Sequence, residues 1–415
     1  MMGFNQSASH SIATLVTLGS HSCGAPDAGW SRKLCSCDGH RASSVCIWRC
    51  KVVFGAKCRG GRQSENVNVS DNPTLAAMQA RPWHPKWGAR LGATYFVHKA
   101  FPWLGRYFGE APLRSTLAPG LDGIVSWGGR LPAKTAMRIA RLRQLPHWHL
   151  EDGFLRSVGL GKDGSIPISI IIDDKALPVD AGRASRLELL VRDAAGGVAH
   201  DVGAPIREAL VEHKLSKYNN LPHTEPRLDR STRRRLLLVD QVFGDVSVEK
   251  ALGSASAFDR MLDDALATGA QIVVRTHPDV IAGHRKGYMT ERASKLPGVT
   301  LMADKVSAAA ILAVVDEVWT VSSQMGFDAL LRGLPVRCYA TPFYAGWGLT
   351  EDRVEDRAQA AHARRATARP TVDQLTFAAF SLYPVYRHPK TWHVLEPLQA
   401  IDCLVEEIAT TRRTG

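Results

Sequence analysis

The sequence lacks the apolar and catalytic patterns that mark several large protein classes. No uninterrupted apolar run approaches the 18 or more residues of a transmembrane helix. The G-x-x-x-x-G-K-[ST] phosphate loop is absent, as is the G-x-S-x-G turn of the esterases. No H-E-x-x-H sequence and no ordered Asp-x-Asp pair follows a predicted strand. These absences argue against a membrane-spanning protein, a P-loop enzyme, an esterase and a metal-dependent site.

Cysteine is scarce beyond the N-terminal region. Six of the eight cysteines lie in the first 58 residues, and only Cys338 and Cys403 follow. The early cysteines do not form the C-x2-C pairs of a zinc site, and the start has no basic n-region of a signal peptide. Residues 1–85 also lack helix or strand periodicity. We expect them to be disordered, or to be an extension upstream of the true start with Met78 as a candidate. The remainder is expected to be a reduced, cytoplasmic protein.

The chain has fewer acidic than basic residues. The chain has 52 Lys and Arg against 40 Asp and Glu, a formal charge of +12. Such a balance predicts acidic partners without choosing among nucleic acid, anionic lipid and anionic sugar. Nucleic acid is disfavoured, because the aromatic residues are not interleaved with the basic ones as a base-stacking platform requires. At 415 residues the chain is long enough for two domains with full cores.

Apolar strands and helical segments alternate from about residue 121. Strands are predicted at residues 122–127, 147–150, 166–172, 236–239, 271–275, 318–321 and 335–340, and helices at 132–143, 185–195, 205–217, 257–267, 306–314 and around 327–331. A polar, arginine-rich segment at 219–235 is the best linker candidate. Two blocks of strand–helix alternation predict an α/β fold with two Rossmann-like domains on parallel sheets. We place the domains at residues 86–225 and 226–370, followed by bracing helices in 371–415.

Reactive side chains follow the predicted strands, where ligands of parallel α/β sheets bind. Glu151 and Asp152 are paired carboxylates that could supply a general acid or base, and Arg156 nearby could bind an anion. The alternative for this loop is a salt-bridged turn. Asp245 ends the sequence DQVFGD after a later strand. Its alternative is the N-cap of the next helix.

Two further loops carry groups suited to an anion. His277 precedes a proline, which favours an extended backbone at the strand end, and Arg285 and Lys286 add two cations of the kind that bind a nucleotide phosphate. Ser322 and Ser323 end a strand where a helix begins, so that free backbone N–H groups lie beside hydroxyls. The alternative there is an ordinary serine cap. Four such loops at one predicted sheet edge favour a binding site.

Together these loops resemble the capsule polysaccharide biosynthesis proteins that are retaining β-Kdo glycosyltransferases of the Kps C type. The resemblance runs from about residue 124 to 353, and order and spacing agree throughout. It is carried by VSWGGRLPAKTAMRIAR, LEDGFLRSVGLG, ISIIIDD, DQVFGD, RTHPDVIAGHRKG, SSQMGFDALLRGLPV and PFYAGWGLTEDR. It implies a GT-B-like fold whose two Rossmann-like domains face a cleft, with the acceptor on the side of residues 86–225 and the CMP-sugar on the side of 226–370.

The resemblance also implies roles for individual residues. Asp245 aligns with the carboxylate nucleophile, and Glu151, or less directly Asp152, aligns with the base that deprotonates the acceptor hydroxyl. His277 would lie near the anomeric centre of the donor. Implied donor-binding positions are Gln241, Arg285, Lys286, Ser322, Ser323 and Gly326, and candidate anion or acceptor positions are Arg130 and Arg156. The implied donor is CMP-Kdo, with no metal or other cofactor.

Two departures from the family pattern leave the acceptor open between a lipid and an oligosaccharide. Residues 176–181 read ALPVDA where the family has a Tyr-Tyr-Asp-Ala segment, and the chain carries one set of motifs where two-module members carry two. The resemblance implies a role in capsule biosynthesis and export, with peripheral binding to the anionic inner membrane from the cytoplasm. The alternatives are a transferase with another nucleotide-sugar donor and a non-catalytic glycan-binding member. Retention of Glu151, Asp245 and His277 argues against the latter.

Overall fold

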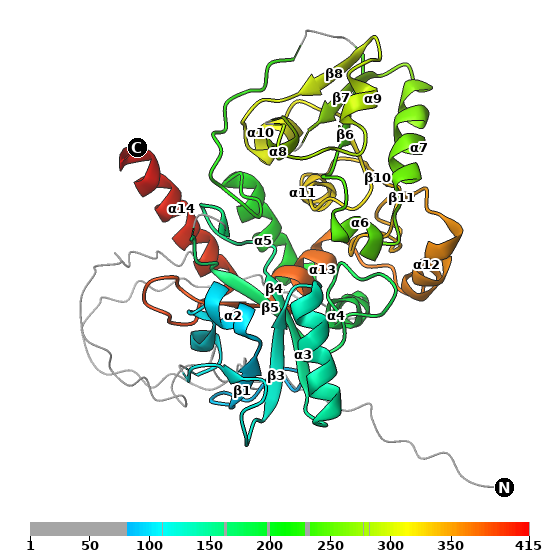
Figure 1. Cartoon of the computed structure of the whole chain (residues 1–415). Coiled ribbons are helices and arrows are strands. Elements are labelled where there is room, and N and C mark those ends of the chain that lie inside the picture. The colour runs from blue at the N-terminus through cyan, green and yellow to red at the C-terminus, as the bar shows by residue number, and fades with distance from the viewer. Residues whose placement is uncertain are drawn as a thin grey trace, which may run out of the picture. The chain divides into compact units, whose positions relative to one another are not determined.

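The computed structural model describes residues 81–109, 111–161, 164–196, 200–228, 233–276, 278–281 and 283–414 (Figure 1). The chain divides into two units, residues 1–64 and 65–415, and every element described below belongs to the second. The expectation of disorder for residues 1–85 falls almost wholly outside the described residues. Only residues 81–85 can be compared with it. Arg81 donates from its two Nη atoms to the carbonyls of Pro384 and Ser381, at 3.0 Å each, so this short segment is folded onto the domain.

The first sheet has six strands in the order β12-β5-β4-β3-β1-β2. They are β1 (Leu91–Ala93), β2 (Arg114–Ser115), β3 (Gly123–Trp127), β4 (His147–Asp152), β5 (Ser169–Asp173) and β12 (Pro384–Tyr386). Its helices are α2 (Tyr95–Ala100), α3 (Leu131–Leu142), α4 (Arg186–Ala195) and α5 (His200–Glu212), with a 3-10 turn, η3 (Leu104–Tyr107). Neighbours from β2 to β4 are parallel, whereas β5 is antiparallel to both β4 and β12. The prediction of a purely parallel sheet is therefore wrong at this edge. The residues that the structure describes between β4 and β5 form no α-helix, and a parallel partner would need such a crossover.

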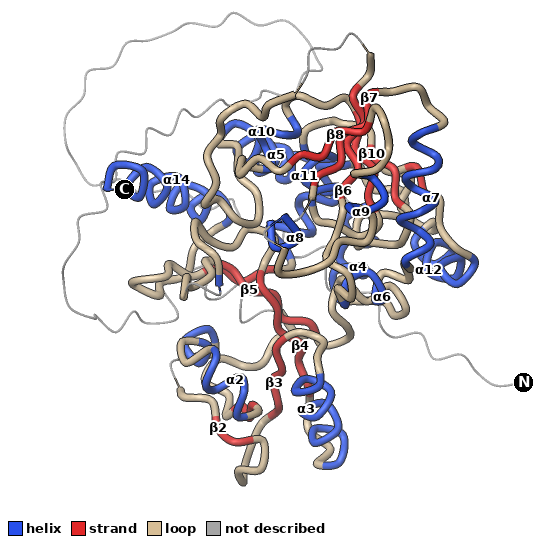
Figure 2. The backbone as a smooth tube through the Cα atoms, turned by 45° about the horizontal axis from the view of Figure 1, so that its top comes forward, coloured by secondary structure: helices blue, strands red, loops and turns tan. Residues whose placement is uncertain are grey.

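The second sheet is parallel throughout, in the order β11-β10-β9-β6-β7-β8. Its strands are β6 (Arg235–Val239), β7 (Gln271–Arg275), β8 (Val299–Met302), β9 (Glu317–Thr320), β10 (Val336–Cys338) and β11 (Glu351–Asp352). Its helices are α6 (Val246–Lys250), α7 (Ala255–Leu266), α8 (Pro278–Ile281), α9 (Thr290–Ala293), α10 (Ala308–Leu312), α11 (Met325–Leu331) and α12 (Gln359–Arg365), with a 3-10 turn, η5 (Asp356–Ala358). Figure 2 shows the strands of the two sheets as separate groups. The chain thus has the predicted α/β architecture of two Rossmann-like domains.

The C-terminal segment returns to the first domain. Helix α13 (Val372–Thr376) packs on α5, and the following π-helix, η6 (Phe377–Leu382), packs on α4. Helix α14 (Pro397–Thr414) lies beside α5 (Figure 1). The sequence analysis predicted bracing helices for residues 371–415 and missed strand β12, which forms one edge of the first sheet. None of the helices in the described ranges is both long and apolar enough to cross a bilayer.

A cluster of four phenylalanines joins the two domains next to the strand ends. Phe154, directly after β4, stacks on Phe343 with ring centroids 4.4 Å apart. Phe327 of α11 stacks on Phe380 of the π-helix at 5.8 Å and meets Phe154 edge-on at 6.1 Å. Gln324 also donates to the Phe154 carbonyl at 3.1 Å. These contacts hold the loop after β4 against the loops of the second domain.

Candidate active site

A pocket of about 700 Å³ is lined by residues of both domains. From the first domain come the end of β4, the Gly128–Gly129 turn and the start of α3; from the second come α6 and the loop that contains Arg285. Five lining residues are cationic (Arg130, Lys134, Arg183, Lys250 and Arg285), and three are acidic (Glu151, Asp180 and Asp245). The lining therefore carries a net positive charge, which favours an anionic ligand.

Glu151 and Asp152 are the last two residues of β4, and of the two only Glu151 lines the large pocket. Glu151 lines the large pocket, and a Cβ placed on Gly128 would lie 3.5 Å from its Oε2 atom. Burial raises the pKa of Glu151; Lys217 acts to lower it, and Asp152 raises it further. A raised pKa makes a pocket carboxylate a stronger base than an ordinary glutamate, which suits it to accepting a proton.

Arg156 binds neighbouring residues of its own loop. Its Nε atom lies 2.8 Å from Asp152 Oδ2, and its Nη atoms donate to Ser157 Oγ at 2.7 Å and to the Ser165 carbonyl at 3.1 Å. It is 3% exposed, and it lies outside the linings of both pockets described here. Its burial and its ion pair with Asp152 favour a structural role for Arg156 over the predicted anion- or acceptor-binding role. The salt-bridged turn considered for this loop holds for Asp152 and Arg156, while Glu151 faces the pocket.

Asp245 is both a helix cap and a pocket residue. Its Oδ1 atom accepts a hydrogen bond from Ser247 N at 2.9 Å, which caps α6, and the residue is exposed at the pocket wall. The preceding Gly244 has φ +78°, a left-handed conformation that glycine adopts without strain. The cap uses one carboxylate oxygen, Oδ1, and leaves the other free of this bond.

Gln241 and Ser322 meet at the switch point of the second sheet. The chain runs from β6 to β7 and β8 on one side and returns to β9 on the other, and ligands of such sheets bind where the direction reverses. Gln241 follows β6 and Ser322 follows β9. The Gln241 amide donates to Ser322 Oγ at 3.0 Å, and its Oε1 atom accepts from Ser322 N, also at 3.0 Å. The two candidate donor-binding residues therefore form one hydrogen-bonded unit.

Ser323 and Gly326 pack behind that unit. The Ser323 carbonyl accepts a hydrogen bond from the Tyr344 hydroxyl at 2.5 Å, and its Oγ atom accepts from Met325 N at 3.2 Å. A Cβ on Gly326 would lie 2.3 Å from the same Tyr344 hydroxyl. The glycine therefore lets Tyr344 approach helix α11 closely. Ser323 and Gly326 both lie outside the two pocket linings, and both contact Tyr344.

Asp240 organises the loop that carries Arg285. Its carboxylate accepts hydrogen bonds from the backbone N–H groups of Tyr288, Met289 and Thr290 at 3.0–3.1 Å. Arg285 lines the large pocket, whereas Lys286 is exposed away from it and its carbonyl accepts from Phe243 N at 2.7 Å. His277 lies outside the described residues.

A smaller pocket of about 90 Å³ adjoins the first. Its lining includes Glu151, Asp152, Lys217 and Ser322, so that Glu151 borders both spaces. Sequence reasoning missed Lys217, because it stands at the edge of the linker with no motif around it. It also missed Lys250 and Asp180, whose side chains pair at 2.9 Å across the domains, and His149 on β4. For His149 a signal existed, since it precedes Glu151 by two residues on a strand.

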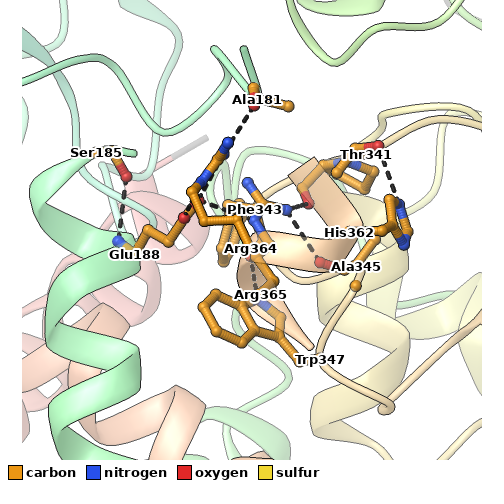
Figure 3. Close-up of polar contacts among 12 residues, drawn as sticks. Ala181, Ser185, Glu188, Thr341, Phe343, Ala345, Trp347, His362, Arg364 and Arg365 are labelled. Atoms are coloured by element: carbon orange, nitrogen blue, oxygen red, sulfur yellow. Dashed lines mark hydrogen bonds and ion pairs between the residues drawn. The ribbon is translucent and has the colours of Figure 1, made fainter. Parts of the chain in front are cut away.

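A buried charge cluster fixes the PFYAGWG segment beside the site (Figure 3). Arg365 of α12 contacts Glu188 of α4 at 3.0 Å and donates to the carbonyls of Pro342 and Ala345 at 2.7 and 3.0 Å. Both side chains of the Arg365–Glu188 pair are at most 3% exposed. Arg364 contacts the other oxygen of Glu188 and the Ala181 carbonyl. The cluster joins the two domains by one buried ion pair, Arg365–Glu188, and by a second pair, Arg364–Glu188, that is partly exposed.

Among the described residues, no group of three His, Cys, Asp or Glu side chains is arranged to hold a metal ion. The lining instead offers carboxylates, cations and backbone groups. Such an arrangement can bind an anionic ligand between the domains, present Asp245 from one side and place a basic carboxylate, Glu151, on the other.

Comparison with known proteins places these residues in a family. The capsule polysaccharide biosynthesis protein family matches residues 122–223 and 217–386. The capsule polysaccharide modification protein LipA of Neisseria meningitidis serogroup A is 37% identical over 321 residues, which cover 73% of this chain and 45% of LipA. The lipopolysaccharide-processing protein LpsZ of Rhizobium meliloti is 34% identical over 283 residues, covering 64% of this chain and 60% of LpsZ. The chain thus spans about half the length of the curated relatives that it matches.

Two solved structures share the fold. The beta Kdo 2,4 transferase of Thermosulfurimonas dismutans KpsC matches with a TM-score of 0.68 and 36% identity, covering 76% of this chain and 98% of that chain. The beta Kdo 2,7 transferase of the same KpsC matches with a TM-score of 0.56 and 24% identity, covering 77% and 98%. The first likeness extends to sequence, and the second shows the fold alone.

Proposed function

The chain belongs to the capsule polysaccharide biosynthesis family, and we propose that it is a glycosyltransferase that moves Kdo from CMP-Kdo to a lipid or glycan acceptor with retention of configuration. One observation carries the proposal: Asp245 and Glu151, from different domains, line one pocket whose cations outnumber its acids. The 36% identity to the beta Kdo 2,4 transferase of KpsC supports Kdo as the transferred sugar.

The first step uses Asp245 as the nucleophile. One of its carboxylate oxygens attacks the anomeric carbon of Kdo, the bond from that carbon to the phosphate oxygen breaks, and CMP leaves with the bonding electrons. Asp245 stands at the pocket wall with Lys250 and Arg285 in the same lining. These cations would offset the charge of the leaving phosphate and of the sugar's own carboxylate.

The second step uses Glu151 as the base. The acceptor hydroxyl gives its proton to Glu151 and attacks the anomeric carbon, and the bond to Asp245 breaks and frees its carboxylate. Two inversions give net retention. The raised pKa of Glu151 supports this role, since a base works best when its pKa approaches the working pH. Arg130, at the Gly128–Gly129 turn, is available to bind an anionic group of the acceptor.

The Gln241–Ser322 unit supports a donor site at the switch point of the second domain. We assign CMP to this side, with Arg285 as the cation inside the pocket and Lys286 as a longer-range charge. Ser323 and Gly326 act through packing. The role of His277 near the anomeric centre rests on the family resemblance. We expect the transfer to need no metal. We also expect peripheral binding to an anionic membrane, to which each Lys or Arg near the lipid would contribute about 1 kcal/mol of binding free energy.

Donor consumption tests the proposal. The purified protein is incubated with CMP-Kdo, with and without a Kdo-terminated glycoside or a lysophospholipid, and CMP release and product mass are followed. CMP release with a Kdo-extended product is the expected result. Consumption of a UDP- or GDP-sugar in place of CMP-Kdo would assign another donor, and binding of the glycoside without turnover of any donor would make the chain a glycan-binding member.

A further inference from the structure

His149 shares a face of β4 with the proposed base. His147, His149 and Glu151 alternate along the strand, and alternate residues of a strand point to the same side. His149 and Glu151 both line the large pocket, whereas His147 does not. The register places His149 opposite Ser126 of β3 and Asp173 of β5. It is therefore mounted between two paired strands in the middle of the sheet, where the backbone is rigid.

The two histidines differ in how their ring nitrogens are used. The His147 Nε2 atom lies 3.0 Å from Ser126 Oγ, which is the usual arrangement of a half-buried structural histidine. The His149 ring meets the His147 ring edge-on at 4.5 Å, and no described residue forms a hydrogen bond with either of its nitrogens. A half-buried imidazole that lines a pocket with unused donor and acceptor atoms is available to a ligand.

The electrostatic setting of His149 selects the class of that ligand. Burial, together with Arg183 and Lys250 and against the effect of Asp180, lowers the pKa of His149 to about 4. The ring is therefore neutral near pH 7 and gives little attraction to a phosphate or carboxylate. A neutral imidazole offers one donor and one acceptor, which complements a hydroxyl group, itself both donor and acceptor.

We propose that His149 binds a hydroxyl of the acceptor sugar next to the hydroxyl that Glu151 deprotonates. This assignment deepens the proposed function and rests on it. Residues i and i+2 of a strand lie roughly 7 Å apart, so both side chains can reach neighbouring hydroxyls of one sugar ring from the same side. His149 is then a specificity-determining residue that favours acceptors with a polyhydroxylated ring at the attacking end. Donor chemistry at Asp245 does not require it.

Kinetics separate this role from a structural one. The variants are His149→Phe, which keeps a ring without nitrogens; His149→Gln, which keeps hydrogen-bonding groups without a titrating ring; and His147→Phe as the matched control on the same strand. CMP release without acceptor reports the donor step, and transfer to a Kdo-terminated glycoside reports the acceptor step. We expect His149→Phe to reduce kcat/KM for the acceptor about ten-fold, the value of roughly one hydrogen bond, and to leave the donor step within about two-fold. His149→Gln should recover part of the loss, and His147→Phe should change neither step by more than about two-fold.

Wild-type acceptor kinetics in His149→Phe, or equal losses in both steps, would overturn the inference. A binding measurement keeps it independent of the donor. In Asp245→Ala protein labelled with 15N-histidine, the imidazole signals of His149, assigned with His149→Gln, should shift when the Kdo-terminated glycoside is added, and those of His147 should shift less. If the wild type consumed no CMP-Kdo but His149 still shifted, the donor assignment would fail and the acceptor site would stand. An unmoved His149 signal at saturating glycoside would refute the site.

Discussion

Lys250 Nζ lies 2.9 Å from Asp180 Oδ2, and the backbone between the same segments is tied as well, with Ala181 N donating to the Lys250 carbonyl at 2.9 Å. Lys250 is the last residue of α6, and Asp245 is the cap at the other end of that helix. A loop of the first domain therefore anchors the helix of the second domain that presents the proposed nucleophile. The position of Asp245 depends on contacts across the domain boundary.

Breaking the Asp180–Lys250 ion pair should lower the rate of the donor step. Asp180→Asn releases the end of α6, and we expect kcat for CMP release to fall about ten-fold, equivalent to about 1.4 kcal/mol. Lys250→Met breaks the same contact and also removes a cation from the pocket, so it should lose more than Asp180→Asn. Because both changes break one contact, the double variant should lose little more than Lys250→Met alone. Stopped-flow or coupled CMP-release assays measure the three rates. Losses that multiply would show that the two residues act separately.

The buried Glu188–Arg365 pair should matter more for stability than for chemistry. Glu188→Gln leaves the guanidinium of Arg365 without its counter-charge in a site where the side chains are at most 3% exposed. Removing one partner of a buried pair typically costs about 3–5 kcal/mol. Chemical denaturation should show a loss of that size. The matched control is Lys295→Met, which breaks an exposed pair with Glu291 and should change the stability far less, because solvent screens exposed charges. Equal effects of the two changes would contradict the structural role of the cluster.

Most of the fold follows from local patterns in the sequence. The predicted strand at 271–275 coincides with β7, and the strand at 236–239 falls within β6, because continuous apolar runs mark strands buried on both faces. The antiparallel β5 and the return of β12 were not predictable in this way. Both depend on long-range pairing, as in Pro384 opposite Ile171, which no local period encodes.

The candidate site was likewise predictable where local sequence patterns decide, and was not where packing decides. Strand-end position and residue type led to Glu151, Asp245, Arg285 and Ser322, because parallel sheets place such positions at one edge. Gln241 came from the family resemblance alone. The same reasoning did not foresee the position of Arg156, whose side chain is buried against Asp152 and Ser165. Whether a charged side chain faces ligand or protein depends on packing. Sequence spacing does not reveal that direction.

The rate of transfer to the acceptor should fall on the acid side of the pH–rate profile, and it should do so at a higher pH than an ordinary glutamate would give. Burial raises its pKa from the usual 4.5, and Lys217, Asp152 and Arg156 are the charged groups that act on it. The base is active when deprotonated, so transfer should fall as the pH drops through this raised pKa. Lys217 lowers the pKa, and therefore Lys217→Met should move this fall to higher pH. A pH–rate profile of transfer with the donor saturating is measured for the wild type and for Lys217→Met. If the variant lost activity at the same pH as the wild type, Glu151 would not be the base.

Asp328 of α11 should make the protein less stable as the pH rises. Burial raises its pKa from 3.8 to about 6, against the opposing effects of Arg332 and Lys217. Between these values the folded state binds more protons than the unfolded state, so stability is highest below pH 3.8 for this group and is lost as the pH passes 6. The shift corresponds to roughly 3 kcal/mol. Asp328→Asn should therefore raise the free energy of unfolding at pH 8 by up to that amount and change it little at pH 4. An equal gain at both values would exclude titration of Asp328 as the cause.

The central claim is that Asp245 forms a covalent bond with the sugar. Intact-protein mass spectrometry of the protein mixed with CMP-Kdo, in the absence of acceptor and quenched in acid, tests it most directly. We predict a population heavier by one Kdo residue, a modified peptide that contains Asp245, and no such population in Asp245→Ala. An adduct that persisted in Asp245→Ala, or wild-type transfer by that variant, would contradict the account.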